Sequence, residues 1–246
     1  MSLSSARLSC APVQLEHRVR PIHLRPATEL AERVLLPGDP HRALFVAQEL
    51  LEKPLMFNHS RGLWGYTGLA DDGRALSIQS TGMGGPSAAI VCEELIALGA
   101  RRLVGIGTCG ALREDLELGA LLVAAEALPA DGASAALGAD GRVAASPRLT
   151  KRLVDAGAQP VVVATTDLFY DGRDGTHEWA GRGAAAVEME TATLFRLAEL
   201  RGVEAAAVLG VTDVPAADGS RRAAPDELEE IGLRVGRAGY AALRAR

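Results

Sequence analysis

Residues 75–106 have the sequence ALSIQSTGMGGPSAAIVCEELIALGARRLVGI. The segment begins with a short apolar run, Ala75–Ser80, whose length and pattern are typical of a buried strand. A glycine-rich turn follows, and Pro86 then opens a run whose apolar residues recur every three or four positions until Gly99. A second apolar run, Leu103–Ile106, comes directly after it. This order of strand, helix and strand predicts a sheet covered by helices.

The same alternation continues in both directions along the chain, without an internal repeat or a low-complexity linker. It predicts an α/β sandwich. Further helices are expected after Pro40, over Thr191–Leu200 and after Pro225, although three glycines in the last segment argue against a straight helix. The other expected strands are Arg33–Leu36, Ala120–Ala125, Pro160–Thr165, Ala184–Val187 and Ala205–Val211.

Two segments rich in small and polar residues interrupt this pattern. Ala127–Ala145 is expected to form a loop or a hairpin excursion, and Ala216–Ala224 a mobile loop. Residues 1–20 contain serine and arginine but no long apolar segment, so they are expected to be an extension outside the fold. Residues 21–246 are expected to form a single domain.

Composition excludes several classes of protein. The chain has 246 residues, 48% of them hydrophobic, and a net charge of −5, which together predict a folded domain without a transmembrane span. A slightly acidic chain is a poor non-specific nucleic-acid binder. The cysteines and histidines show neither disulfide nor metal-ligand spacing, so we expect no metal and a cytoplasmic protein. The cysteines are Cys10, Cys92 and Cys109.

The segment Gly105–Gly110 matches the G-x-G-x-x-G pattern of dinucleotide-binding folds. That interpretation needs a helix to cross over to the next parallel strand, and the short link to Ala120–Ala125 leaves no room for one. We therefore disfavour a dinucleotide site and interpret the segment as a third glycine-rich turn after a strand. The other two such turns contain Gly38 and Gly82. Three turns of this kind predict a small-molecule site at the sheet edge.

Charged side chains accompany these turns. Arg42 lies in the first turn of a predicted helix, where free N–H groups already attract anions, although a solvated arginine is the simpler interpretation. Glu188 and Glu190 flank Met189 and point to one side if the segment is extended, where carboxylates can accept hydrogen bonds from sugar hydroxyls. Asp213 ends a strand and is a candidate general acid or a turn residue.

Taken together, these segments resemble the bacterial nucleoside phosphorylases of the purine nucleoside and uridine phosphorylase family. The resemblance runs from about His23 to the C-terminal helix. It implies a three-layer αβα sandwich with a mixed, partly barrel-like sheet, and hexamers built from dimers that share active sites. It also implies phosphorolysis of nucleosides to free base and pentose 1-phosphate, with phosphate as co-substrate and no cofactor. The matching motifs are LLPGDPHRA, HSRGLWGYTG, STGMGGPSAAIVCEEL, GTCGAL, TTDLFY, VEMETATLF and VTD.

The resemblance also implies a role for each matching residue. Gly38, Arg42 and Thr108 would bind phosphate, together with Arg61 lent by a neighbouring subunit. The ribose contacts would be Glu188, Met189 and Glu190, together with His23 reaching a neighbour's ribose 5′-hydroxyl. Phe169 and Tyr170 would pack on the base, Asp213 would face N7 of a purine, and Arg221 or Arg222 would assist it.

Two departures from the family pattern leave alternatives open. Gly105 stands where the family has a phosphate-binding arginine, with Arg101 and Arg102 just upstream as candidate replacements. A nucleosidase that uses water, or a protein that only binds nucleosides, therefore stays possible. The glutamine–arginine pair that reads uracil is missing after Tyr170, and Asp213 favours purines, so uridine is the second choice.

Overall fold

The computed structural model describes residues 20–170, 175–216 and 219–244, so the predicted extension lies outside it apart from Arg20. The strands are β1 Arg33–Leu36, β2 Glu52–Asn58, β3 Gly65–Leu69, β4 Ala75–Gln79, β5 Arg102–Ala111, β6 Leu121–Ala130, β7 Val143–Ala144, β8 Gln159–Thr166, β9 Ala186–Glu188, β10 Glu204–Ala216 and β11 Gly219–Arg222. The helices are α1 Pro40–Leu50, α2 Gly85–Ala97, α3 Gly132–Ala136, α4 Pro147–Asp155, α5 Gly175–Gly181, α6 Thr191–Arg201 and α7 Pro225–Leu243, with a short 3₁₀ turn, η1, at Ser60–Gly62.

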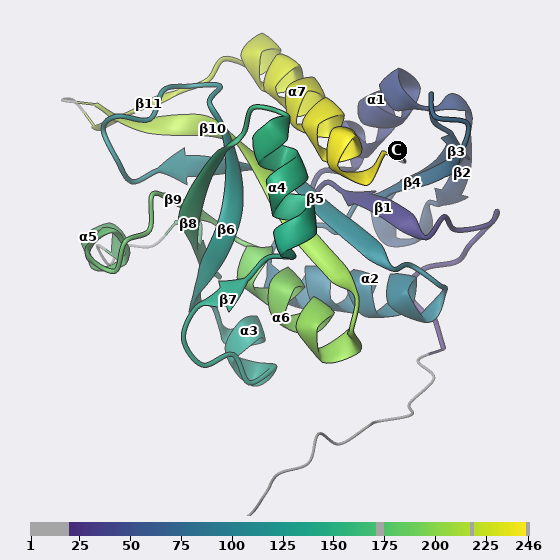
Figure 1. Ribbon diagram of the computed structural model, residues 1–246, viewed down its shortest axis with the longest axis horizontal. Helices are drawn as coiled ribbons and strands as arrows, with labels where there is room; N and C mark the ends of the chain where they lie inside the picture. The colour runs from purple at the N-terminus through teal and green to yellow at the C-terminus, as the bar shows by residue number, and fades with distance from the viewer. Residues whose placement is uncertain (1–19, 171–174, 217–218, 245–246) are drawn as a thin grey trace, which may run out of the picture.

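The strands form one mixed sheet in the order β11-β10-β6-β8-β9-β5-β1-β4-β3-β2, with β7 paired to β6 (Figure 1). An additional parallel pairing between β5 and β10 closes β5, β10, β6, β8 and β9 into a ring. Strand β1 is buried along its whole length because it pairs in parallel with β4 and β5 and is covered on both faces. The α/β sandwich with a partly barrel-like sheet is thereby confirmed.

Helices cover the two faces of the sheet (Figure 1). Helices α1 and α4 both pack against α7 on one side, whereas α2, α3 and α6 pack together on the other. The three glycines of α7 do not interrupt the helix, in contrast to the expectation from sequence. They form its packing face: a Cβ at Gly232 would meet Phe45, one at Gly236 would meet Val46, and one at Gly239 would meet Ile106.

The predicted glycine-rich turn at Gly105–Gly110 is wrong. Strand β5 continues through this segment to Ala111 and pairs with β10 over nearly its whole length. The glycines are needed for packing rather than for a turn, because a Cβ at Gly107 would lie 2.9 Å from Leu209 Cδ2. The link from β5 to β6 contains no helix, in agreement with the argument against a dinucleotide fold.

The two segments rich in small and polar residues both contain regular structure. Within Ala127–Ala145, β6 runs on to Ala130, α3 follows, and β7 returns to pair antiparallel with β6, in agreement with the expected hairpin excursion. Within Ala216–Ala224, residues 219–222 form β11, which pairs with the end of β10 instead of forming a mobile loop. Strands β2 and β3 and helices α4 and α5 were not predicted. The signal for α4 was present in the sequence, because Leu149 and Leu153 lie four positions apart on its buried face.

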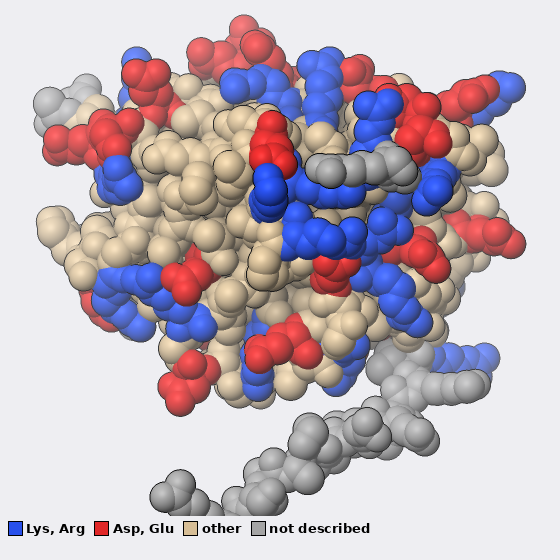
Figure 2. Space-filling model, viewed as in Figure 1, with Lys and Arg blue, Asp and Glu red and all other residues tan. Residues whose placement is uncertain are grey.

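Acidic and basic side chains are interspersed on the face shown in Figure 2. No helix within residues 20–170, 175–216 and 219–244 is long and apolar enough to cross a membrane. In the same ranges, no group of three or more histidine, cysteine, aspartate or glutamate side chains is arranged to hold a metal ion.

Candidate active site

A pocket with about 400 Å³ of empty volume lies between the sheet and helices α2 and α6. Its rim comes from two segments that follow parallel strands, with Gly38 after β1 and Thr81 after β4. Glu188 and Glu190 line it from the junction of β9 and α6, and Gly105 from the middle of β5. The predicted convergence of strand ends on one site is therefore present, with β5 contributing its interior rather than a turn.

Arg42 lies beside this pocket in the first turn of α1. Asp39 caps the helix by accepting hydrogen bonds from the backbone N–H groups of His41 and Arg42. The guanidinium donates to the backbone oxygen of Ile106 at 3.3 Å, and Gly232 of α7 leaves the space in which it packs. Burial lowers the pKa of Arg42, and the nearby carboxylates of Asp39 and Glu190 oppose that change. A largely desolvated cation of this kind can bind an anionic ligand strongly.

The two glutamates of the VEME motif have different surroundings. The buried carboxylate of Glu188 accepts hydrogen bonds from the Thr165 hydroxyl and from the backbone N–H groups of Glu190 and Thr191. Glu190 accepts one hydrogen bond, from the backbone N–H of Gly84 at the start of α2. Glu188 therefore stabilises the start of α6 through its hydrogen bonds. Glu190 can still accept further hydrogen bonds from a ligand in the pocket.

Burial and, to a smaller extent, the neighbouring Glu188 raise the pKa of Glu190 to about 7, against the opposing effects of Gly84 and Arg42. Burial also raises the pKa of Glu188, although its hydrogen bonds from Thr165 and the backbone favour the ionised form. Two buried carboxyl groups so close together cannot easily both be ionised, so a ligand that donates hydrogen bonds here relieves an unfavourable charge.

Asp213 of β10 lies opposite Arg222 of β11, with Arg222 Nε 3.5 Å from Asp213 Oδ1. Asp213 Oδ2 also accepts a hydrogen bond of 2.9 Å from the Thr212 hydroxyl. The Arg222 guanidinium lies over the ring of Phe169, 5.7 Å from its centre, and Phe169 in turn makes an edge contact with Tyr170. The four residues predicted to act on the base thus lie in one cluster.

Arg221 is not part of this cluster. It pairs with Val214 in the β10–β11 ladder, and alternate residues of a strand point to opposite faces. Residues 171–174, where the uracil-reading pair of the uridine enzymes would be sought, lie outside the described residues. Thr108 and Met189 are both half-buried next to pocket-lining residues.

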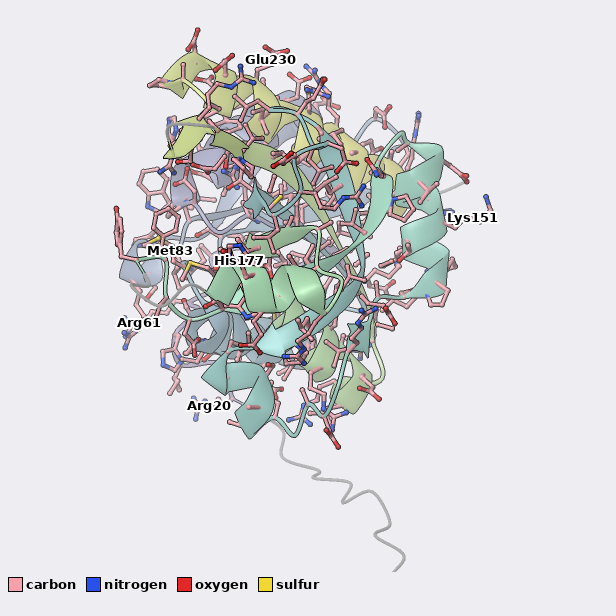
Figure 3. The ribbon with its side chains drawn as sticks, turned by 90° about the vertical axis from the view of Figure 1, so that its left-hand side faces the viewer. Arg20, Arg61, Met83, Lys151, His177 and Glu230 are labelled. Carbon is pink, nitrogen blue, oxygen red and sulfur yellow. The ribbon has the colours of Figure 1, made fainter. Side chains whose placement is uncertain are left out.

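Arg61 and His23 lie away from the pocket. Arg61 sits in η1 with a left-handed backbone (φ 59°), and its exposed side chain stands out from the body of the molecule near Met83 (Figure 3). His23 is held by Glu94 of α2 through a contact of 2.6 Å from its Nδ1 atom. Neither residue lines the pocket of its own chain, and the role across a subunit interface that the resemblance implies stays a prediction.

Gly105 leaves the inner part of the pocket apolar. Leu194 and Ala207 lie within 3.5 Å of the place where a Cβ at Gly105 would stand. The two upstream arginines do not replace the missing side chain: Arg101 donates to backbone oxygens at the end of α2, and Arg102 lies 3.9 Å from Glu32. Arg42 is therefore the arginine that the fold brings to this pocket.

Sequence reasoning did not assign a role to Thr165, Gly84 or Glu94. Thr165 lies at the end of β8, where its hydroxyl bonds Glu188 and accepts from the backbone N–H of Ala192. Gly84 has φ 86° and caps α2. The glycine pair before Pro86 was a visible signal for Gly84, but a buried Thr or Glu inside an apolar segment carries no such signal.

Comparison with known proteins agrees with this geometry. The family model described as "Phosphorylase superfamily" matches residues 32–245. The chain belongs to this superfamily. It is 42% identical over 196 residues to a purine nucleoside phosphorylase DeoD-type of Caldanaerobacter subterraneus subsp. tengcongensis, covering 75% of this chain and 84% of that relative. A DeoD-type relative from Geobacillus kaustophilus is 37% identical over 202 residues, covering 78% of this chain and 85% of the relative.

Among solved structures, this phosphorylase-superfamily chain is similar to the uridine phosphorylase of Vibrio fischeri ES114, with a TM-score of 0.76 and 26% identity. The match covers 87% of this chain and 90% of that chain. The superfamily member thus has relatives named for purine nucleosides and a structural neighbour named for uridine.

Proposed function

We propose that the protein is a nucleoside phosphorylase that cleaves purine nucleosides to free base and pentose 1-phosphate. The observation that carries this proposal is that Arg42, hydrogen-bonded to the backbone oxygen of pocket-lining Ile106, lies beside the pocket that Glu190 lines. The guanidinium supplies a cation for phosphate, and the carboxylate supplies an acceptor for the sugar hydroxyls. Gly38 allows the turn after β1 to lie close to the turn after β4, since a Cβ at Gly38 would lie 3.2 Å from the backbone oxygen of Gly82.

The reaction follows from this arrangement. A phosphate oxygen held by Arg42 attacks C1′ as the C1′–N bond breaks, and the electron pair of that bond passes to the departing base. The sugar carries positive charge in the transition state, which the phosphate and Glu190 stabilise. Asp213 gives a proton to N7 of a purine, and Arg222 stabilises the carboxylate that remains. Phosphate is a co-substrate, and we propose that no other cofactor takes part.

Two further features belong to the proposal. His23 and Arg61 serve the pocket of a second copy, which requires a homodimer and favours a hexamer built from three dimers. We also propose a cytoplasmic location, which is the location expected from the spacing of the cysteines. Light scattering checks the assembly, and a monomer would leave both residues without a ligand to contact.

The test is cleavage of inosine, adenosine and uridine, each with and without phosphate, with the released base measured by chromatography. We expect release of hypoxanthine and adenine that depends on phosphate. Release that is independent of phosphate would favour a nucleosidase, consistent with the missing side chain at Gly105. Cleavage of uridine alone would move the assignment to the uridine enzymes, and binding without cleavage of any substrate would leave a nucleoside-binding protein.

A second test concerns the acid. Asp213→Asn keeps the shape of the side chain but cannot donate a carboxyl proton, so we expect a fall of at least a hundredfold in kcat for inosine. Binding of inosine, measured by calorimetry, should change less than threefold. Unchanged turnover would remove Asp213 from the mechanism.

A further inference from the structure

Glu94 is a buried carboxylate in α2, and its hydrogen-bond donors come from the segment Ile22–Leu24 near the N-terminus. Its two oxygens accept the backbone N–H groups of Ile22, His23 and Leu24 at 2.7–3.1 Å. Oε1 also contacts the His23 ring at Nδ1, at 2.6 Å. The side chain of Glu94 is only 4% exposed, so this segment, and not water, surrounds the carboxylate.

These contacts favour the ionised form of Glu94 and one tautomer of the His23 ring. Burial raises the pKa of Glu94, but the hydrogen bonds from Leu24, His23 and Ile22 outweigh it and hold the pKa below its usual value. The ionised carboxylate can only accept, so Nδ1 of His23 must carry the proton it donates. In the neutral ring the lone pair then lies on Nε2, at the other side of the imidazole, and the side chain is 25% exposed.

The fold keeps His23 away from the Glu190 end of the pocket of its own chain, where the proposed function places the sugar. Gly84, whose N–H bonds Glu190, caps the start of α2, and Glu94 lies ten positions further along the chain. At the helical rise they lie about 15 Å from each other, which is beyond the reach of an imidazole held against Glu94. Any sugar that His23 contacts is therefore bound in the pocket of another copy, as the proposed function requires.

We propose that Glu94 is a positioning residue that selects the tautomer of His23, so that Nε2 accepts a hydrogen bond from the 5′-hydroxyl of a nucleoside in the neighbouring pocket. This inference rests on the proposed function. It implies that the enzyme prefers nucleosides that carry a hydrogen-bond donor at the 5′ position. A carboxylate that accepts the proton of one imidazole nitrogen in this way also makes the other nitrogen a better acceptor.

The kinetic test compares inosine, which has a 5′-hydroxyl donor, with 5′-deoxy-5′-fluoroinosine, which is close in size and has no donor there. For the wild type we expect kcat/KM about tenfold higher for inosine. His23→Ala should reduce that ratio to about one. Glu94→Gln should reduce it to about twofold, because its amide can donate to Nδ1 and drive the ring proton to Nε2. Both kcat/KM values are measured on the same preparation of each variant. Their ratio is therefore independent of how much of that variant is folded.

Glu93→Gln is the matched control. Glu93 is the adjacent residue of α2, and its carboxylate pairs with Arg201 instead of His23. The substitution makes the same chemical change one position away, and the substrate ratio should stay at the wild-type value. A wild-type ratio in Glu94→Gln, or an equal fall in both variants, would overturn the positioning role.

The ring nitrogens can be observed directly by ¹⁵N NMR of histidine-labelled protein at a pH where His23 is neutral. We expect Nε2 unprotonated in the wild type and protonated in Glu94→Gln. An Nε2–H tautomer in the wild type would refute the assignment of Glu94 even if nucleosides are cleaved. Absence of cleavage with the expected tautomer would instead refute the proposed function, so the two failures are distinct.

Discussion

Arg222 Nε lies 3.5 Å from Asp213 Oδ1 across the β10–β11 ladder, whereas Arg221 pairs with Val214 in the same ladder. The sequence presents these two arginines as equivalent candidates, and the register of the strands separates them. A one-residue shift of register would exchange their roles, since successive side chains face opposite sides of a strand.

Arg222→Ala should therefore lower kcat for inosine about tenfold, because a cation near the developing charge of the base is lost. Arg221→Ala should change kcat less than twofold and serves as the matched control. Steady-state kinetics at saturating phosphate measures both. Equal effects of the two substitutions would contradict the observed register.

Gly105→Arg should strengthen phosphate binding, because it places a second guanidinium at the pocket. A charge-assisted contact of this kind corresponds to roughly a tenfold to hundredfold fall in KM for phosphate. The side chain must pass Ala207, whose Cβ lies 3.3 Å from the position of the new Cβ. Gly105→Met adds comparable bulk without charge and should raise the KM for phosphate or leave it unchanged. An equal response to arginine and methionine would show that space, and not charge, governs this position.

Nucleoside binding should weaken as the pH falls through about 7. The pKa of Glu190 is raised to about 7, chiefly by burial and then by Glu188, and only its ionised form accepts hydrogen bonds from two sugar hydroxyls. We expect the Kd of inosine, measured by calorimetry without phosphate, to rise about tenfold between pH 8 and pH 6. In Glu190→Gln the Kd should be higher and independent of pH over this range. A flat profile in the wild type would contradict the role of Glu190.

The same raised pKa affects the stability of the fold in the opposite direction, because low pH weakens nucleoside binding but stabilises the folded state. Between the ordinary carboxyl pKa and about 7 the folded state binds more protons at Glu190 than the unfolded state does. The ionised, buried carboxylate therefore destabilises the folded state fully above pH 7, and this penalty disappears at low pH. Glu190→Gln removes the penalty, so its increase in Tm should be larger at pH 8 than at pH 5, as measured by calorimetric scans.

Gly236→Ala should destabilise the protein by about 1–3 kcal/mol, because the new Cβ would lie 2.9 Å from Val46 Cγ2 where α7 packs on α1. The control is Gly181→Ala near the end of α5, where a Cβ would meet no heavy atom within 4 Å. That change should leave stability the same or slightly higher, since alanine favours helix more than glycine. Urea midpoints of the two variants measure the difference. A neutral Gly236→Ala would show that the two helices can separate at little cost.

The sequence alone determined where the elements with clear apolar runs and marked starts lie. Each of the seven predicted strands overlaps an observed strand, and Pro40, Pro86 and Pro225 lie at the starts of helices as expected. Local steric and hydrogen-bond preferences cause these features, and a single segment expresses them fully. Gly38, Arg42 and Glu190 were named through the resemblance of several motifs taken together, because a solvated side chain was the simpler interpretation of Arg42 alone.

Only the tertiary structure decided which residues act together. Gly105–Gly110 resembles a turn in isolation, yet it is the interior of β5 because its backbone pairs with the parallel strand β10. Glu94 looks like one of two adjacent helical glutamates until the N-terminal segment folds onto it. Arg222 differs from Arg221 only through strand register. Contacts between distant parts of the chain create each distinction, and such contacts leave no periodic trace in the segments that make them.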